Sequence, residues 1–188
     1  MKLSRNKKLF LKINSFIGKN KIIDQIMFFC AQYLIYILVF GVLWLGVITL
    51  SGDNFKNMIK LIMTAITFYI ITAWSLALIW KHRRPIVELV EIKELLKPIQ
   101  VWKSFPSDHT GISFIFALIA ILFGCGLFWG IIFIIMASLI AFSRIYVGVH
   151  YPRDIIGGIF FAIFFVFISF KLLENITQPL YNFFINLL

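Results

Sequence analysis

GISFIFALIAILFGCGLFWGIIFIIMASLIAF, residues 111–142, contains no charged side chain. A helix needs about 20 apolar residues to cross the hydrocarbon core of a membrane, so this stretch predicts parts of two consecutive spans, over 109–126 and 128–148. Phe128 and Trp129 lead into the second of them, as aromatic residues at a membrane interface do. Three further stretches are comparably apolar, at 22–50, 58–80 and 155–173. The sequence therefore predicts five membrane-spanning helices, or six.

The composition is typical of a protein whose outer surface faces lipid. Of the 188 residues, 61% are hydrophobic and 14% are charged, and the mean hydropathy is +0.96. Soluble domains have about half apolar and about a quarter charged residues, because polar side chains must cover their surface. No Pro/Gly/Ser-rich linker divides the chain. We therefore expect an all-α, polytopic membrane helix bundle that forms a single domain over 1–188.

The charge is strongly positive, +10 from 18 Lys and Arg against 8 Asp and Glu. In a membrane protein this balance favours contact with anionic lipid or an anionic substrate, and we expect no nucleic-acid partner. Segment 1–21 is basic, and its apolar residues alternate with lysines, which is typical of a helix lying at the interface. Cys30 and Cys125 have no metal-ligand spacing, so we expect them to be inert core residues.

Three polar clusters interrupt the apolar chain. They are KHRRP, residues 81–85, KSFPSDH, residues 103–109, and SRIYVGVHYPRD, residues 143–154. Successive spans alternate in direction, so the clusters share one membrane face when five spans are counted. Between the first two clusters, residues 86–96 have apolar side chains at helical spacing, which predicts a short amphipathic helix that lies at the interface and covers the site.

The clusters contain the side chains of a phosphate-transfer site. Arginine binds phosphate oxygens through its planar guanidinium group, and a helix N-terminus with a serine hydroxyl also binds anions. Arg84, Arg144 and Ser107 would therefore hold a phosphate group together. His150 and Asp154 are four residues apart, one turn on a helix, so the carboxylate can fix the imidazole tautomer and leave the other ring nitrogen free as a nucleophile.

His109 stands just inside the helix start predicted at Ser107–Asp108, where it can give a proton to a bound phosphate ester. Two other chemistries use the same residue types. His82, His109 and His150 are potential metal ligands, but several arginines in the same place would repel a cation. A hydrolase with Ser107 as nucleophile would need a nucleophile elbow, which the sequence lacks. We expect a site without metal or cofactor.

The three clusters resemble the motifs of the type 2 phosphatidic acid phosphatase family, relatives of the vanadium haloperoxidases. That family carries the motifs K-x6-RP, PSGH and SR-x5-H-x3-D. The third motif is complete here, from Ser143 to Asp154, and the second reads PSDH, residues 106–109. The region that carries the resemblance by motif is 77–154.

The sequence departs from the family pattern at two positions. Asp108 stands in place of Gly in the second motif, and the first motif keeps Arg84-Pro85 but has Ala77 where the family has lysine. Lys81, about one helical turn after Ala77, is the nearest candidate to supply the missing charge. We therefore expect Lys81 at the phosphate site.

The resemblance implies metal-independent removal of the terminal phosphate from a lipid phosphate or diphosphate. It implies a phosphohistidine on His150, oriented by Asp154, with His109 acting as acid and then as base. Phosphate binding would be carried by Arg84, Ser107, Arg144 and the N–H groups around Asp108.

The PSDH form, the small size and the five-helix layout resemble the bacterial undecaprenyl-diphosphatase branch. Its members recycle the carrier of cell-wall peptidoglycan synthesis by converting undecaprenyl diphosphate to undecaprenyl phosphate. Alternatives are phosphatidylglycerophosphate, phosphatidate or lipid A phosphate as substrate, and a non-catalytic protein that binds anionic lipid or transports a phosphorylated compound. We expect polyprenyl or glycerolipid phosphate and membrane lipids as partners.

The expected location is the plasma membrane, crossed several times. The face with the three clusters holds most of the 18 Lys and Arg, which by the positive-inside rule would place it in the cytoplasm. The resemblance to carrier-lipid recyclers implies the outer face instead. Several of these charges are expected substrate ligands, and we expect the outer face.

Overall fold

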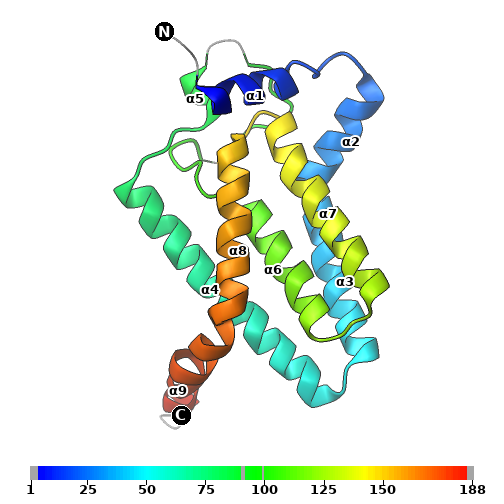
Figure 1. Cartoon of the computed structure of the whole chain (residues 1–188), viewed down its shortest axis with the longest axis vertical. Helices are drawn as coiled ribbons and strands as arrows, with labels where there is room; N and C mark the ends of the chain where they lie inside the picture. The colour runs from blue at the N-terminus through cyan, green and yellow to red at the C-terminus, as the bar shows by residue number, and fades with distance from the viewer. Residues whose placement is uncertain (1–3, 90–91, 99, 186–188) are drawn as a thin grey trace.

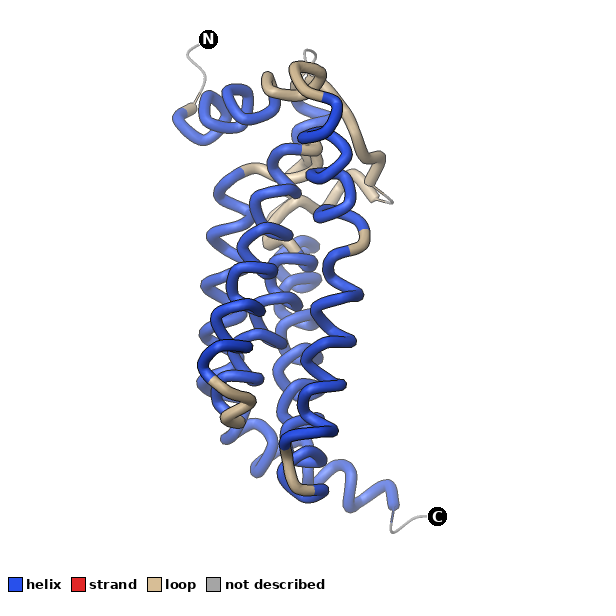
Figure 2. The backbone as a smooth tube through the Cα atoms, turned by 90° about the vertical axis from the view of Figure 1, so that its right-hand side faces the viewer, coloured by secondary structure: helices blue, strands red, loops and turns tan. Residues whose placement is uncertain are grey.

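The computed structural model describes residues 4–89, 92–98 and 100–185 (Figure 1). This part of the chain is helical and contains no strand (Figure 2), which confirms the predicted all-α class. The elements in chain order are α1 Arg5–Asn14, α2 Lys21–Gln32, α3 Leu34–Thr49, α4 Gly52–Ile79, α5 Pro85–Glu88, α6 Asp108–Leu122, α7 Leu127–Tyr146, α8 Pro152–Leu172, the π-helical turn η1 Leu173–Thr177 and α9 Gln178–Ile185.

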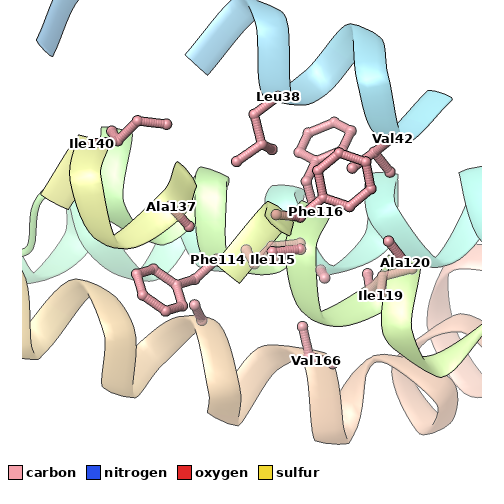
Figure 3. Close-up of a cluster of buried hydrophobic side chains, with 14 of the residues drawn as sticks. Leu38, Val42, Phe114, Ile115, Phe116, Ile119, Ala120, Ala137, Ile140 and Val166 are labelled. Carbon is pink, nitrogen blue, oxygen red and sulfur yellow. The ribbon is translucent and has the colours of Figure 1, made fainter. Parts of the chain in front are cut away.

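Helix α6 forms the centre of the bundle. It packs against α3, α4, α7 and α8, and in Figure 1 it is seen between α8 and α7. Figure 3 shows Ile115 and Ile119 of α6 in a cluster that also includes Leu38 of α3. Ala137 of α7 and Val166 of α8 complete other sides of the same cluster. A helix that is apolar and buried on most sides belongs to the core of a bundle.

Three helices are long and apolar enough to cross a membrane, namely Gly52–Ile79, Leu127–Tyr146 and the continuous stretch Pro152–Phe183. A fourth crossing results if α2 and α3 count as one span, since they meet at a bend of 52°. The span predicted over 109–126 corresponds to α6, which has 15 residues and is shorter than the roughly 20 that a crossing needs. The described chain therefore provides three to four candidate spans by length and composition.

Helix α1 lies across the end of the bundle at which α7 ends and α8 begins (Figure 1). Phe10 of α1 is fully buried, with its ring edge-on to that of Tyr151 at a centroid distance of 5.3 Å. The amide of Asn14 joins α1 to the loop below it, because its Oδ1 accepts from the N–H of Lys93 and its Nδ2 donates to the carbonyl of the same residue. Segment 5–14 therefore covers the end of the bundle that carries the polar clusters.

The helix predicted over 86–96 is shorter than expected. Helix α5 ends at Glu88, and the described residues 92–96 are not helical; residues 90–91 lie outside the described part. The reason is visible at its two ends. The Tyr151 hydroxyl donates to Glu88 and Asn14 holds Lys93, so contacts with other elements replace the local periodicity.

Candidate active site

The three polar clusters meet at one end of the bundle, as the count of helices predicted. Backbone hydrogen bonds tie them together. The N–H of Ser104 donates to the carbonyl of His82 at 2.9 Å, and the N–H of Ser107 donates to the carbonyl of Asp154 at 3.1 Å. The chain segments that precede α5 and α6 and the first turn of α8 are therefore fixed relative to one another by backbone contacts alone.

The turn between α7 and α8 sets the positions of Arg144 and His150. Gly148 has φ +95°, a conformation that residues with a side chain avoid, and a Cβ there would lie 2.9 Å from the carbonyl oxygen of Lys93. The N–H groups of Val149 and His150 both donate to the carbonyl of Arg144 at 3.2 Å. This turn explains the five-residue spacing between the arginine and the histidine.

His150 and Asp154 lie together as their spacing predicted. Nδ1 of His150 is 3.6 Å from Oδ2 of Asp154, and both side chains are buried. The same carboxylate oxygen accepts from Ser104 Oγ at 2.5 Å and from the N–H of Tyr151 at 2.9 Å. The second of these bonds caps α8, whose first residue is Pro152. Asp154 is thus held by two donors on the side of its carboxylate that faces the imidazole.

Two buried arginines stand beside His150. Nη1 of Arg84 lies 3.3 Å from Nε2 of His150 and donates to the carbonyl of Val149. Nη1 of Arg144 donates to the carbonyl of Ala31 at 2.8 Å, close to the bend between α2 and α3. The buried Nε atoms of both arginines have no hydrogen-bond partner within the protein. Buried donors are almost always satisfied, and here they suit the oxygens of an anion.

A cavity of about 500 Å³ opens between these residues. Arg84, Arg144 and His150 line it together with Asp108 and His109, from the first turn of α6. Its other walls include Gln32, Tyr36, Trp74 and residues 96–98. Five of the eight site residues predicted from the sequence therefore border one hollow.

The remaining predicted residues occupy other places. Asp154 does not line the cavity; it contacts the imidazole of His150, which does. Ser107 is fully buried at the N-cap of α6, where its hydroxyl accepts from Thr110 and makes no capping bond. Lys81 is exposed and is not among the residues that line the cavity.

A different lysine lies at the site. Lys103 has an exposed fraction of 2% and forms an ion pair with Asp108. Its ammonium is also 5.7 Å from the ring centroid of Trp74. In the sequence, Lys103 belongs to the polar cluster 103–109 and lies close to the second motif. It is not part of any motif, so the sequence did not identify it as a site residue. Ser104, which holds Asp154, was missed for the same reason.

The electrostatics of the site follow from burial and from its cations. Burial, helped by Arg84 and Arg144, lowers the pKa of His150 to about 4, although Asp154 opposes the shift. The imidazole is therefore neutral at pH 7, and one of its ring nitrogens carries an electron pair. Burial also lowers the pKa values of Arg84 and Lys103 from their ordinary values, against the influence of Asp108. Among the described residues, no three His, Cys, Asp or Glu side chains are grouped so as to hold a metal ion.

The sequence family of the chain follows from comparison with known proteins. The family model described as the PAP2 superfamily matches residues 57–178, a range that includes the whole cavity motif set from Arg84 to Asp154. The chain belongs to the PAP2 superfamily. This result confirms the resemblance seen in the three clusters, and it makes the protein an enzyme, a phosphatase with several apolar helices.

Individual PAP2 relatives span most of the chain. The undecaprenyl-diphosphatase BcrC of Bacillus subtilis strain 168 is 30% identical, over 93% of this chain and 86% of its own. The bacitracin transport permease protein BcrC of Bacillus licheniformis is 29% identical, over 91% of this chain and 83% of its own. Among solved structures, the crystal structure of Aquifex aeolicus LpxE superposes with a TM-score of 0.70 at 26% identity, covering 90% of this chain and 96% of that one.

Proposed function

We propose that this PAP2 protein removes the terminal phosphate from undecaprenyl diphosphate in the membrane, through a phosphohistidine on His150. The observation that carries the proposal is the neutral imidazole of His150 in a cavity between two arginines with unpaired Nε donors, backed by a carboxylate. That set suits attack on a phosphorus atom whose oxygens are held by cations.

The first half of the reaction transfers the phosphoryl group to the enzyme. Arg84 and Arg144 bind the oxygens of the terminal phosphate, and Nε2 of His150 forms a bond to phosphorus as the bond to the leaving oxygen breaks. The imidazole becomes positively charged, and Asp154 stabilises that charge through Nδ1–H. His109 gives its proton to the leaving oxygen, so the lipid departs as undecaprenyl phosphate.

The second half restores the enzyme. His109, now neutral, takes a proton from a water molecule, and the water oxygen attacks phosphorus as the phosphorus–nitrogen bond breaks. Inorganic phosphate leaves and His150 is neutral again. Nδ1 of His150 lies 3.6 Å from Oδ2 of Asp154, and catalytic hydrogen bonds of this kind tighten when substrate is bound.

Undecaprenyl diphosphate is favoured by the relative in B. subtilis that bears the name of this activity. The lining of the cavity agrees with a lipid substrate, because it includes the exposed aromatic residues Tyr36 and Trp74. A phosphate bound at His150 could then leave its apolar tail in the bilayer. The alternatives are other lipid phosphates, namely phosphatidylglycerophosphate, phosphatidate and lipid A phosphate.

The proposal includes the placement in the membrane. We place α6 and its flanking residues across the plasma membrane as one of five crossings. Helix α1 then lies at the membrane interface, and the cavity faces the outside of the cell. Single cysteines test the sidedness. Arg83→Cys is exposed near the cavity and Lys56→Cys is exposed near the start of α4, while the native cysteines are buried. A membrane-impermeant maleimide added to intact cells should label only the first.

The function is tested by phosphate release from detergent-solubilised undecaprenyl diphosphate, with a panel of glycerophospholipid phosphates beside it and EDTA present. His150→Ala should lose all release and should no longer form an acid-labile phosphorylated protein. His82→Ala is the matched control, because His82 is half-buried in the neighbouring loop and does not line the cavity. Full activity of His150→Ala would exclude the mechanism, and lipid binding without turnover would favour the non-catalytic alternative.

A further inference from the structure

Asp108 is the one carboxylate on the described wall of the cavity, whose other charged side chains, Arg84, Lys97 and Arg144, are cations. Its side chain is 30% exposed and stands in the first turn of α6. Alone, a negative charge there would repel a phosphate at Arg84 and Arg144, and it would repel a diphosphate more strongly. Its placement therefore needs an explanation within a phosphate site.

Lys103 supplies that explanation. Its ammonium is buried and forms an ion pair with Asp108 from behind the cavity wall, beneath the ring of Trp74. Burial lowers the pKa of Lys103, because it disfavours the charged form, and the neighbouring Asp108 opposes that shift. Asp108 therefore helps to keep Lys103 charged, and the ion pair adds no net charge to the site.

We propose that Lys103 and Asp108 form a charge-balancing pair that determines how strongly this site prefers a lipid diphosphate over a lipid monophosphate. The inference rests on the proposed phosphatase function and extends it to substrate choice. Lys103 acts through Asp108 and is a positioning residue. By cancelling the carboxylate, it lets the two arginines attract the diphosphate, which carries about one more negative charge than the monophosphate.

The proposal predicts opposite effects for replacing Lys103 and for replacing Asp108. Lys103→Met leaves an unpaired carboxylate in the wall, so the ratio of kcat/KM for diphosphate to that for monophosphate should fall by about tenfold, the effect of one charge several ångströms away in a protein site. Asp108→Asn leaves an unpaired cation, so the ratio should rise. The double variant removes both charges, so its ratio should return toward that of the wild type. Lys103→Arg should keep the wild-type ratio.

The experiment uses the full-length protein in detergent, with farnesyl diphosphate and farnesyl phosphate as substrates that share one tail. The matched control is the exposed pair Lys56–Asp53, 3.5 Å apart at the start of α4, changed to Met and Asn in the same combinations. Thermal unfolding shows whether each variant is folded. If Lys103→Met does not fold, Asp108→Asn and Lys103→Arg decide the question, because both keep a cation in the wall.

The proposal is supported if the kcat/KM ratio falls in Lys103→Met, rises in Asp108→Asn and returns toward the wild-type value in the double variant. Equal losses on both substrates, or an unchanged ratio in Asp108→Asn, overturn it and leave Lys103 with a structural role. If the wild type releases phosphate from neither substrate nor from undecaprenyl diphosphate, the proposed function itself has failed. If the wild type is active but no variant changes the kcat/KM ratio, the charge-pair inference is wrong and the proposed function still stands.

Discussion

Replacing Ser104 by alanine tests how Asp154 is aimed at His150. The Ser104 hydroxyl is fully buried and donates to Oδ2 of Asp154 at 2.5 Å. A hydrogen bond to a charged group contributes about 1.5–3 kcal/mol net, and the N–H of Tyr151 remains as the second donor. If that free energy supports the transition state, Ser104→Ala should lower kcat by about 10-fold to 100-fold, since about 1.4 kcal/mol corresponds to a factor of ten.

The assay is phosphate release from a lipid diphosphate at saturating substrate, with thermal unfolding of each variant beside it. Ser169→Ala is the control. Ser169 is equally buried, but its hydroxyl donates to Val166 one turn earlier in α8, so it should change stability by no more than about 1 kcal/mol and leave kcat as it is. A folded Ser104→Ala enzyme whose kcat stays within about twofold of the wild type would refute the idea that Ser104 positions the carboxylate.

Four further outcomes are expected. Because the pKa of His150 is lowered to about 4, the acidic fall of kcat/KM in a pH titration, where His150 gains its proton, should lie near pH 4; an acidic fall near pH 6.5 would contradict this assignment. The unfolded chain binds that proton from about pH 6.5, so stability should decline between pH 6.5 and 4. Gly157→Ala should destabilise the fold by about 1–3 kcal/mol in thermal unfolding, because its Cβ would lie 2.2 Å from the ring of Phe105. Inorganic phosphate should raise the unfolding midpoint, and Arg144→Ala should abolish the shift.

Much of the site could be predicted because it follows from local spacing. Asp154 lies in the first turn of α8 and His150 stands two residues before that helix, so their four-residue spacing brings them together. Counting the predicted spans placed the three clusters at one end. Lys103 and Ser104 could not be found in this way. Their roles depend on contacts with Asp108 and with Asp154, fifty residues later in the case of Ser104, and neither residue type is marked by a periodic pattern.

The differences between the predicted spans and the observed helices also have physical causes. Hydropathy locates apolar segments but does not show where a helix bends, and the single span predicted over 22–50 contains two helices that meet at 52°. Hydropathy also predicted a third span, 109–126, that extends beyond the end of α6. The last residue of α6 is Leu122, and the positive-φ residues Gly124 and Gly126 follow it. Glycines in that conformation end helices whatever the hydropathy around them.

The bond between Arg144 and the carbonyl of Ala31 has a consequence for how this protein can vary. The acceptor is a backbone atom, so any residue small enough for that buried position supplies it equally well. Inserting or deleting a residue near the bend at Tyr33 is different, because each residue turns a helix by about 100° and would carry the carbonyl away from the guanidinium. The segment before α3 is therefore constrained in its length more than in the identity of its residues.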